Sequence, residues 1–108
     1  EFKYRSFSNF DLIAKVTYNG IRKTTAKDGY RPHIEFENID FKTSGSQYFI
    51  NKQGEVNSNE TQIAFIKIVS TDFFNKKLFD GIKFKFYEGP SYIGQGEVLE
   101  VLNKKLEK

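Results

Sequence analysis

Residues 79–102 read FDGIKFKFYEGPSYIGQGEVLEVL and predict a β-hairpin around which the rest of the fold is built. Ile82, Phe84 and Phe86 alternate with two lysines and a tyrosine, which is the period of a strand with one buried face. Residues 88–91 (EGPS) then predict a turn, because glycine tolerates positive φ and proline fixes φ and removes a donor.

The return strand of this hairpin is expected to begin at Tyr92. Gly94 and Gly96 lie inside it and indicate a bulge or a close approach of the backbone to a neighbour. Residues 98–102 (VLEVL) are apolar apart from one glutamate, which predicts that this end of the strand is covered on both faces.

The composition indicates one small domain with an aromatic core. A chain of 108 residues buries about two-thirds of its unfolded surface, and this chain has 12 Phe and 6 Tyr. It has no cysteine, which excludes disulfides and thiolate metal sites. The net charge of +3 permits an anionic partner without requiring one. No apolar run approaches the about 18 residues of a membrane span and no secretion signal is visible, so we expect a cytoplasmic protein without a membrane partner.

Two segments before residue 37 carry strand patterns. Residues 9–18 place apolar side chains on one parity and are followed by an Asn19-Gly20 turn signal. Residues 30–36 (YRPHIEF) predict a strand that begins at Pro32, which has no backbone donor. Its expected inward residues are Ile34 and Phe36, and its outward residues are His33 and Glu35. The loop between the two strands is basic, and three of its side chains are expected to face solvent: Arg22, Lys23 and Lys27.

The middle of the chain is less regular. Residues 44–46 (SGS) and 57–59 (NSN) are typical of loops, with a short strand at 47–50 between them and a turn at 52–54. Residues 61–69 (TQIAFIKIV) predict a strong strand. Residues 71–80 are predicted as an extended loop that covers four core side chains. These are Phe73, Phe74, Leu78 and Phe79, and any that prove exposed would form a partner-binding patch.

No segment shows the ten or so residues of 3.6-residue periodicity that a stable helix requires. Short strands and glycine-rich turns predict an all-β fold, a small antiparallel β-barrel of about six strands spanning residues 9–103. Residues 1–8 are expected to be a flexible arm, and residues 104–108 a solvated tail.

Three stretches, in this order and spacing, are similar to one known family. Residues 20–36 (GIRKTTAKDGYRPHIEF) resemble its Gly-Gly-Arg-His-Thr-Pro loop followed by Gly-Tyr-Arg-Pro and an aromatic strand. Residues 79–101 resemble its final hairpin, with Glu-Gly-Gly, a short turn and Val-Gly-Ala-Gly. Residues 9–18 lie where its first barrel strand falls. The chain thus resembles the third, C-terminal β-barrel domain of bacterial translation elongation factor Tu, as a stand-alone relative.

The resemblance implies positions for RNA contact, since the family barrel touches the T-stem backbone of aminoacyl-tRNA. The matching residues are His33, Lys42, Glu88 and Gly89. Only Glu88 and Gly89 keep the family identity; His33 replaces a glutamine and Lys42 a threonine. Both replacements are compatible with phosphate or 2′-hydroxyl contact. The family's phosphate-binding loop is absent from these residues, so no nucleotide is expected.

A basic-aromatic cluster adds further candidates. Arg22, Lys23 and Arg31 could hold phosphates and Tyr30 could stack a base. The alternatives are a contact with a protein, or a solvated loop in which Arg31 pairs with Glu35 or Asp28. The complete set of candidate contact residues is Arg22, Lys23, Tyr30, Arg31, His33, Lys42, Glu88 and Gly89.

The functional hypothesis is a non-enzymatic binding module that contacts structured, tRNA-like RNA or a translation-related protein. The alternative is a decoy, inhibitor or immunity-type protein that mimics the parent barrel. His33 is the only histidine and has neither a recognisable nucleophile nor further histidines beside it in sequence, so neither catalysis nor a metal is expected. No cofactor is expected.

Overall fold

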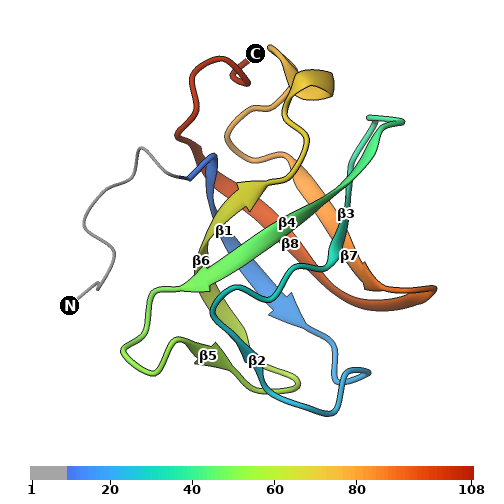
Figure 1. Cartoon of the computed structure of the whole chain (residues 1–108), viewed down its shortest axis with the longest axis vertical. Coiled ribbons are helices and arrows are strands. Elements are labelled where there is room, and N and C mark those ends of the chain that lie inside the picture. The colour runs from blue at the N-terminus through green and yellow to red at the C-terminus, as the bar shows by residue number, and fades with distance from the viewer. Residues whose placement is uncertain (1–9) are drawn as a thin grey trace.

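The computed structural model describes residues 10–108, which form a closed six-stranded antiparallel barrel (Figure 1). The predicted arm at 1–8 lies outside the described residues. In order around the barrel, the strands are β1 (Leu12–Tyr18), β6 (Thr61–Ile68), β4 (Lys42–Phe49), β3 (His33–Phe36), β7 (Lys83–Glu88) and β8 (Ser91–Val101). The all-β barrel prediction is confirmed. Within residues 10–108, no helix has the length and apolar character needed to span a bilayer.

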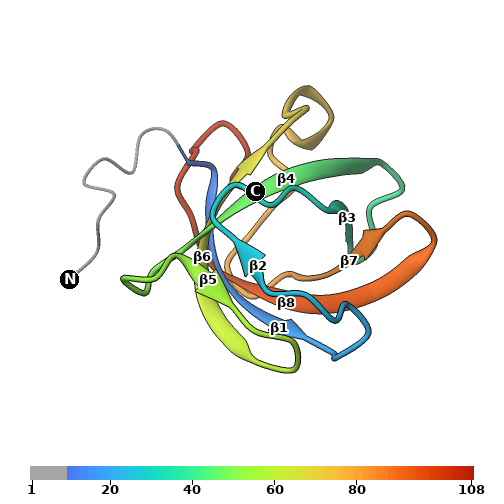
Figure 2. The same cartoon turned by 60° about the horizontal axis from the view of Figure 1, so that its bottom comes forward.

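A short pair of strands closes one end of the barrel. β2 (Ala26–Lys27) pairs antiparallel with β5 (Glu55–Val56), and both lie at the bottom in Figure 1 and across the barrel end in Figure 2. The predicted turn at 52–54 is confirmed: Gly54 has φ +64° and donates its N–H to the Asn51 carbonyl at 3.1 Å. The basic loop thus contains a short strand, with Ala26 buried against the core.

The inward side chains form one aromatic core. Ile34 and Phe36 from β3 share this core with Phe84 and with Val98 from β8. The Phe36 and Phe84 ring centroids lie 5.5 Å apart. The two segments that carry the strongest sequence patterns therefore close the same barrel, as expected.

The glycines of β8 allow the inward phenylalanines of β7 to fit. A Cβ on Gly94 would lie 2.2 Å from Phe86 Cζ, and a Cβ on Gly96 would lie 2.3 Å from Phe84 Cζ. Both distances are far below van der Waals contact, so the predicted close approach is confirmed. The strand register also shifts between Phe86 and Tyr87, which marks a bulge.

The prediction of a loop at residues 44–46 is wrong, because they lie within β4. The inward positions of this strand include Gly45, whose missing side chain leaves room for the Ile34 side chain; a Cβ there would lie 2.5 Å from Ile34 Cδ1. Gln47, also inward, is fully buried and accepts a 2.6 Å hydrogen bond from the Tyr18 hydroxyl. Small and polar residues thus occupy positions that usually carry apolar ones.

The far end of β8 is covered on one face only, unlike the prediction for residues 98–102. Val98 and Val101 are buried, whereas Leu99 is 45% exposed. A register shift against β1, between Ile13 and Ala14, lets two valines three residues apart both point inward. Leu99 therefore falls on the outer surface.

The connection at 71–80 contains a turn of 3-10 helix, η2 (Asp72–Phe74). Phe74 and Leu78 are fully buried as predicted. Phe73 and Phe79 were predicted to be core residues, but they are 53% and 41% exposed. A tight helical turn sends neighbouring side chains in different directions, so Phe73 and Phe74 cannot share one environment.

The C-terminal segment is not the solvated tail that was expected. Leu106 is fully buried, and its carbonyl accepts a 2.9 Å hydrogen bond from Leu78 N–H. Lys108 N–H donates back to the Leu78 carbonyl at 2.7 Å. Figure 1 shows this segment beside the η2 connection at the top of the barrel. One buried leucine and three backbone hydrogen bonds, the third from Lys76 N–H to the Lys105 carbonyl at 3.0 Å, hold the segment in place.

Asp11 is a buried carboxylate that links β6 to the C-terminal segment at this end of the barrel. It is 5% exposed, although its parity suggested an outward position. Its Oδ2 accepts from Ile68 N–H at 2.7 Å and its Oδ1 from Asn103 Nδ2 at 2.9 Å. The carboxylate thereby satisfies a backbone donor at the end of β6.

Candidate functional site

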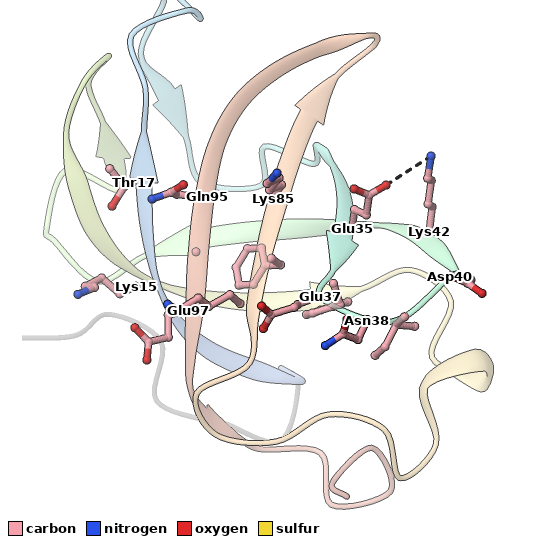
Figure 3. A pocket seen from close by; sticks show the side chains of 15 residues that line it. Lys15, Thr17, Glu35, Glu37, Asn38, Asp40, Lys42, Lys85, Gln95 and Glu97 are labelled. Carbon is pink, nitrogen blue, oxygen red and sulfur yellow. Dashed lines mark ion pairs between the residues drawn. The ribbon is translucent and has the colours of Figure 1, made fainter.

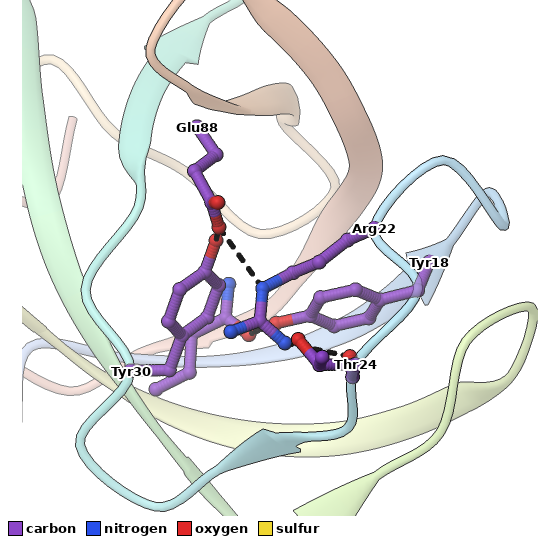
Figure 4. A network of polar contacts seen from close by, with 6 residues as sticks. Tyr18, Arg22, Thr24, Tyr30 and Glu88 are labelled. Carbon is purple, nitrogen blue, oxygen red and sulfur yellow. Dashed lines mark hydrogen bonds and ion pairs between the residues drawn. The ribbon is translucent and has the colours of Figure 1, made fainter.

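Arg22, Tyr30 and Glu88 form a compact cluster, here named the latch, which joins the basic loop to the β7–β8 turn (Figure 4). Arg22 Nε donates to Glu88 Oε1 at 2.9 Å, and the Tyr30 hydroxyl donates to the same oxygen. The Arg22 guanidinium also lies over the Tyr30 ring, 4.3 Å from its centroid, and donates to the Thr24 carbonyl. The expectation that Arg22 faces solvent is wrong, because its side chain is only 19% exposed.

The electrostatics of the latch keep its groups in their bonded forms. Hydrogen bonds from Tyr30 and Arg22 hold the pKa of Glu88 below its ordinary value of 4.5. Burial and the hydrogen bond to Glu88 raise the pKa of Tyr30. Glu88 is therefore ionised at neutral pH, while the Tyr30 hydroxyl stays protonated and donates a hydrogen bond to it. The Arg22 charge and one face of the Tyr30 ring are already engaged, so they are poorly placed to hold a phosphate or stack a base.

A second surface, here named the cross-strand face, consists of outward side chains on β4, β3, β7, β8 and β1. The strand register arranges them in three rows. The first row is Ser44, His33, Tyr87 and Tyr92; the second is Lys42, Glu35, Lys85, Gln95 and Thr17; the third is Lys83, Glu97 and Lys15. Figure 3 shows side chains of the second and third rows pointing to the same side of the sheet.

A groove of about 810 Å³ lies over the second and third rows. Phe36, Phe84 and Gly96 also line it, and the connection from β3 to β4, residues 37–40, forms one edge (Figure 3). The rows carry four lysines and two glutamates, whereas the edge adds the carboxylates Glu37 and Asp40. The strand residues of the groove are therefore net positive, and the two carboxylates of the edge balance them, so that the lining as a whole is neutral.

Only part of the positive charge on the strands is paired. Lys42 Nζ lies 3.4 Å from Glu35 Oε2. Within residues 10–108, no carboxylate lies within ion-pair distance of Lys83 or Lys85. Lys85 instead lies over the Tyr92 ring, 5.6 Å from its centroid. These two lysines are available to an anionic partner.

The first row carries rings from three neighbouring strands. Tyr87 and Tyr92 have centroids 5.8 Å apart at an interplanar angle of 49°. His33 is paired in register with Tyr87, and its Nδ1 lies 3.3 Å from Ser44 Oγ. The sequence reasoning missed Tyr87, Tyr92 and Lys85 as site residues. Their signal was present, since the two tyrosines flank the Glu88-Gly89 turn and must lie side by side in a tight hairpin.

The predicted site residues fall into three groups. His33 and Lys42 lie on the cross-strand face, and His33 lies opposite Tyr87, beside the turn that carries Glu88 and Gly89. Arg22 and Tyr30 are bonded to Glu88 in the latch. Two are exposed and belong to neither surface: Lys23, whose Nζ donates to the Gly20 carbonyl at 2.9 Å, and Arg31. Glu35, a predicted partner of Arg31, pairs with Lys42.

Comparisons with known proteins add no relative. Neither models of known protein families nor curated proteins match this chain. The described residues contain no group of three or more His, Cys, Asp or Glu side chains that could hold a metal ion. The geometry of the cross-strand face and the resemblance described above are therefore the basis for assigning a function.

Proposed function

We propose that this barrel is a non-enzymatic binding module related to the C-terminal barrel of elongation factor Tu, and that its cross-strand face contacts structured, tRNA-like RNA. One observation carries the proposal. The positions that the resemblance implies, His33, Lys42 and the Glu88-Gly89 turn, are far apart in sequence but come from three adjacent strands, with His33 and Lys42 on the cross-strand face and the turn at its end. His33 pairs with Tyr87, the residue before Glu88, and Lys42 pairs with Glu35.

The side chains of this face suit an RNA backbone. Lysines at 42, 83 and 85 supply cations for phosphates. Glu88 is held by the latch, yet its side chain remains 58% exposed, so it can accept a hydrogen bond from a ribose 2′-hydroxyl. Gly89 has φ +58° and stands at the tip of the turn, where its backbone can approach a ligand without a side chain in the way.

Fluorescence anisotropy with a labelled tRNA transcript tests this function. Contact with about three phosphates predicts that affinity falls about 40-fold between about 50 and about 200 mM salt. Lys42→Ala with Lys85→Ala should weaken binding by about tenfold or more, whereas Lys52→Ala with Lys77→Ala, which removes the same charge elsewhere, should have little effect. Absence of binding at low salt, or equal losses in both double variants, would refute the proposal.

A protein partner is a second candidate, favoured by a different surface. The Phe41 and Phe73 rings stack with centroids 4.8 Å apart, yet they are 45% and 53% exposed. Exposed paired aromatic rings are typical of protein contacts. A decoy, inhibitor or immunity-type protein that mimics the parent barrel would use such a patch. It should compete with elongation factor Tu for a shared protein partner in a pull-down, and Phe41→Ser with Phe73→Ser should abolish that competition.

A further inference from the structure

We infer that Tyr87, Tyr92 and Lys85 form a site for a single unpaired nucleotide, in which the base stacks on the tyrosines and Lys85 holds the phosphate. The inference rests on the proposed RNA-binding function and specifies how the RNA is recognised. It predicts that the module prefers RNA with a bulged or looped base over a fully paired stem.

The two tyrosines are held in place before any ligand arrives. They face each other across the β7–β8 hairpin, 5.8 Å apart, and the Tyr92 hydroxyl donates to Gln95 Oε1 at 2.9 Å. Tyr92 is nevertheless 38% exposed. A fixed ring with an exposed surface loses little conformational entropy when a base stacks on it.

A cation lies beside the two rings. Lys85 Nζ lies 5.6 Å from the Tyr92 centroid, and no carboxylate of the described residues pairs with it. A nucleotide carries its base and its phosphate on one ribose, so a ring and a free ammonium side by side can contact both parts of it.

The latch is the other basic-aromatic cluster, and a comparison with it shows why the cluster of Lys85, Tyr87 and Tyr92 is accessible to a ligand. There the guanidinium of Arg22 already covers the Tyr30 ring, and Glu88 neutralises its charge. At Tyr92 the cation lies farther from the ring, with Lys85 Nζ 5.6 Å from the centroid, and no carboxylate of the described residues pairs with it. In the row of Lys85, Lys42 is held by Glu35, so Lys85 is the unpaired cation beside the two rings. One pair of rings and one cation suit a single nucleotide.

An unpaired base is required because a duplex does not offer one. In an A-form helix the bases are stacked inside, and proteins contact the backbone and the 2′-hydroxyls. A bulged nucleotide can swing out and place its ring on tyrosine. The proposed function alone, by contrast, predicts similar affinity for bulged and fully paired stems.

Two RNA hairpins with the same stem separate these outcomes, one fully paired and one carrying a single bulged 2-aminopurine. The wild-type protein should bind the bulged hairpin more tightly and change its 2-aminopurine fluorescence. Tyr92→Ala should weaken binding of the bulged hairpin by about 5- to 150-fold, as loss of one stacked base predicts, and leave the paired hairpin unaffected. Tyr92→Phe, which keeps the ring, should behave like the wild type, and Lys85→Ala should weaken binding while the fluorescence change persists at saturation.

The result that would overturn the inference is equal binding of both hairpins with no effect of Tyr92→Ala on either, which would leave the proposed function standing. If neither hairpin binds at low salt, both the inference and the proposed function fail. Because Tyr92 points outward, Tyr92→Ala should unfold at nearly the same temperature as Tyr92→Phe, and this comparison separates a binding defect from a folding defect.

Discussion

At Gly96 the barrel has room for a hydrogen atom but not for a methyl group. A Cβ there would lie 2.3 to 2.8 Å from three atoms of the Phe84 ring. We therefore expect Gly96→Ala to lower the free energy of unfolding by about 1–3 kcal/mol, the usual cost of overpacking a core. Urea denaturation followed by tyrosine fluorescence measures this directly.

A double variant identifies the cause of that loss. The three nearest atoms all belong to one side chain, so Gly96→Ala combined with Phe84→Leu should cost less than the sum of the two single changes. Gly94 is the matched control. A Cβ there meets the Phe86 ring and also the Thr17 backbone carbonyl at 2.6 Å, so Phe86→Leu should not rescue Gly94→Ala. Strict additivity at Gly96 would show that the clash with Phe84 is not the cause.

The Glu88 carboxylate makes part of the stability depend on pH. Its folded pKa lies below the ordinary value of 4.5 because Tyr30 and Arg22 donate to it. The stabilisation is therefore present above about pH 5 and is lost as the pH falls through the folded pKa. Glu88 is largely exposed, so we expect the contribution to be no more than about 1 kcal/mol. Urea midpoints near pH 7 and pH 3 should differ more for the wild type than for Glu88→Gln; equal differences would contradict this role.

At the scale of elements, the C-terminal segment is a structural part of the barrel. Leu106 is fully buried, whereas Leu99, seven positions earlier, is 45% exposed. Leu106→Ala should reduce the free energy of unfolding by about 2–5 kcal/mol, as for other buried leucines. Leu99→Ala removes the same atoms and should change it by about 0.5 kcal/mol or less. Similar losses in the two variants would contradict the observed packing.

The elements that the sequence predicted are those whose inward positions are apolar. This pattern, an alternation or an apolar run, is present in β1, β3, β6 and β7. The close approach predicted at Gly94 and Gly96 follows from the phenylalanine rings packed against them. β4 was predicted only at its end, as the short strand at 47–50, because three of its inward residues are Thr43, Gly45 and Gln47, which give no apolar period. The packing of the C-terminal segment was not predicted, because its one buried residue, Leu106, gives no hydrophobic periodicity.

At the scale of the whole molecule, the candidate site depends on strand register, which a single sequence does not specify. The resemblance indicated His33, Lys42 and the Glu88-Gly89 turn. It could not show that Tyr87 and Tyr92 continue the row of His33, because the register between β3 and β7, which places His33 opposite Tyr87, decides that pairing. Nor could it show that Arg22 is engaged by Glu88, a residue 66 positions away.

The central claim is that RNA binds the cross-strand face, and amide chemical-shift mapping tests it most directly. On titration of 15N-labelled protein with a tRNA transcript, we expect the largest shifts at His33, Lys85 and Tyr92, with β6 on the opposite wall of the barrel unchanged. Shifts centred on β6 or on the Phe41–Phe73 pair, or an unchanged spectrum with RNA in excess, would contradict the claim.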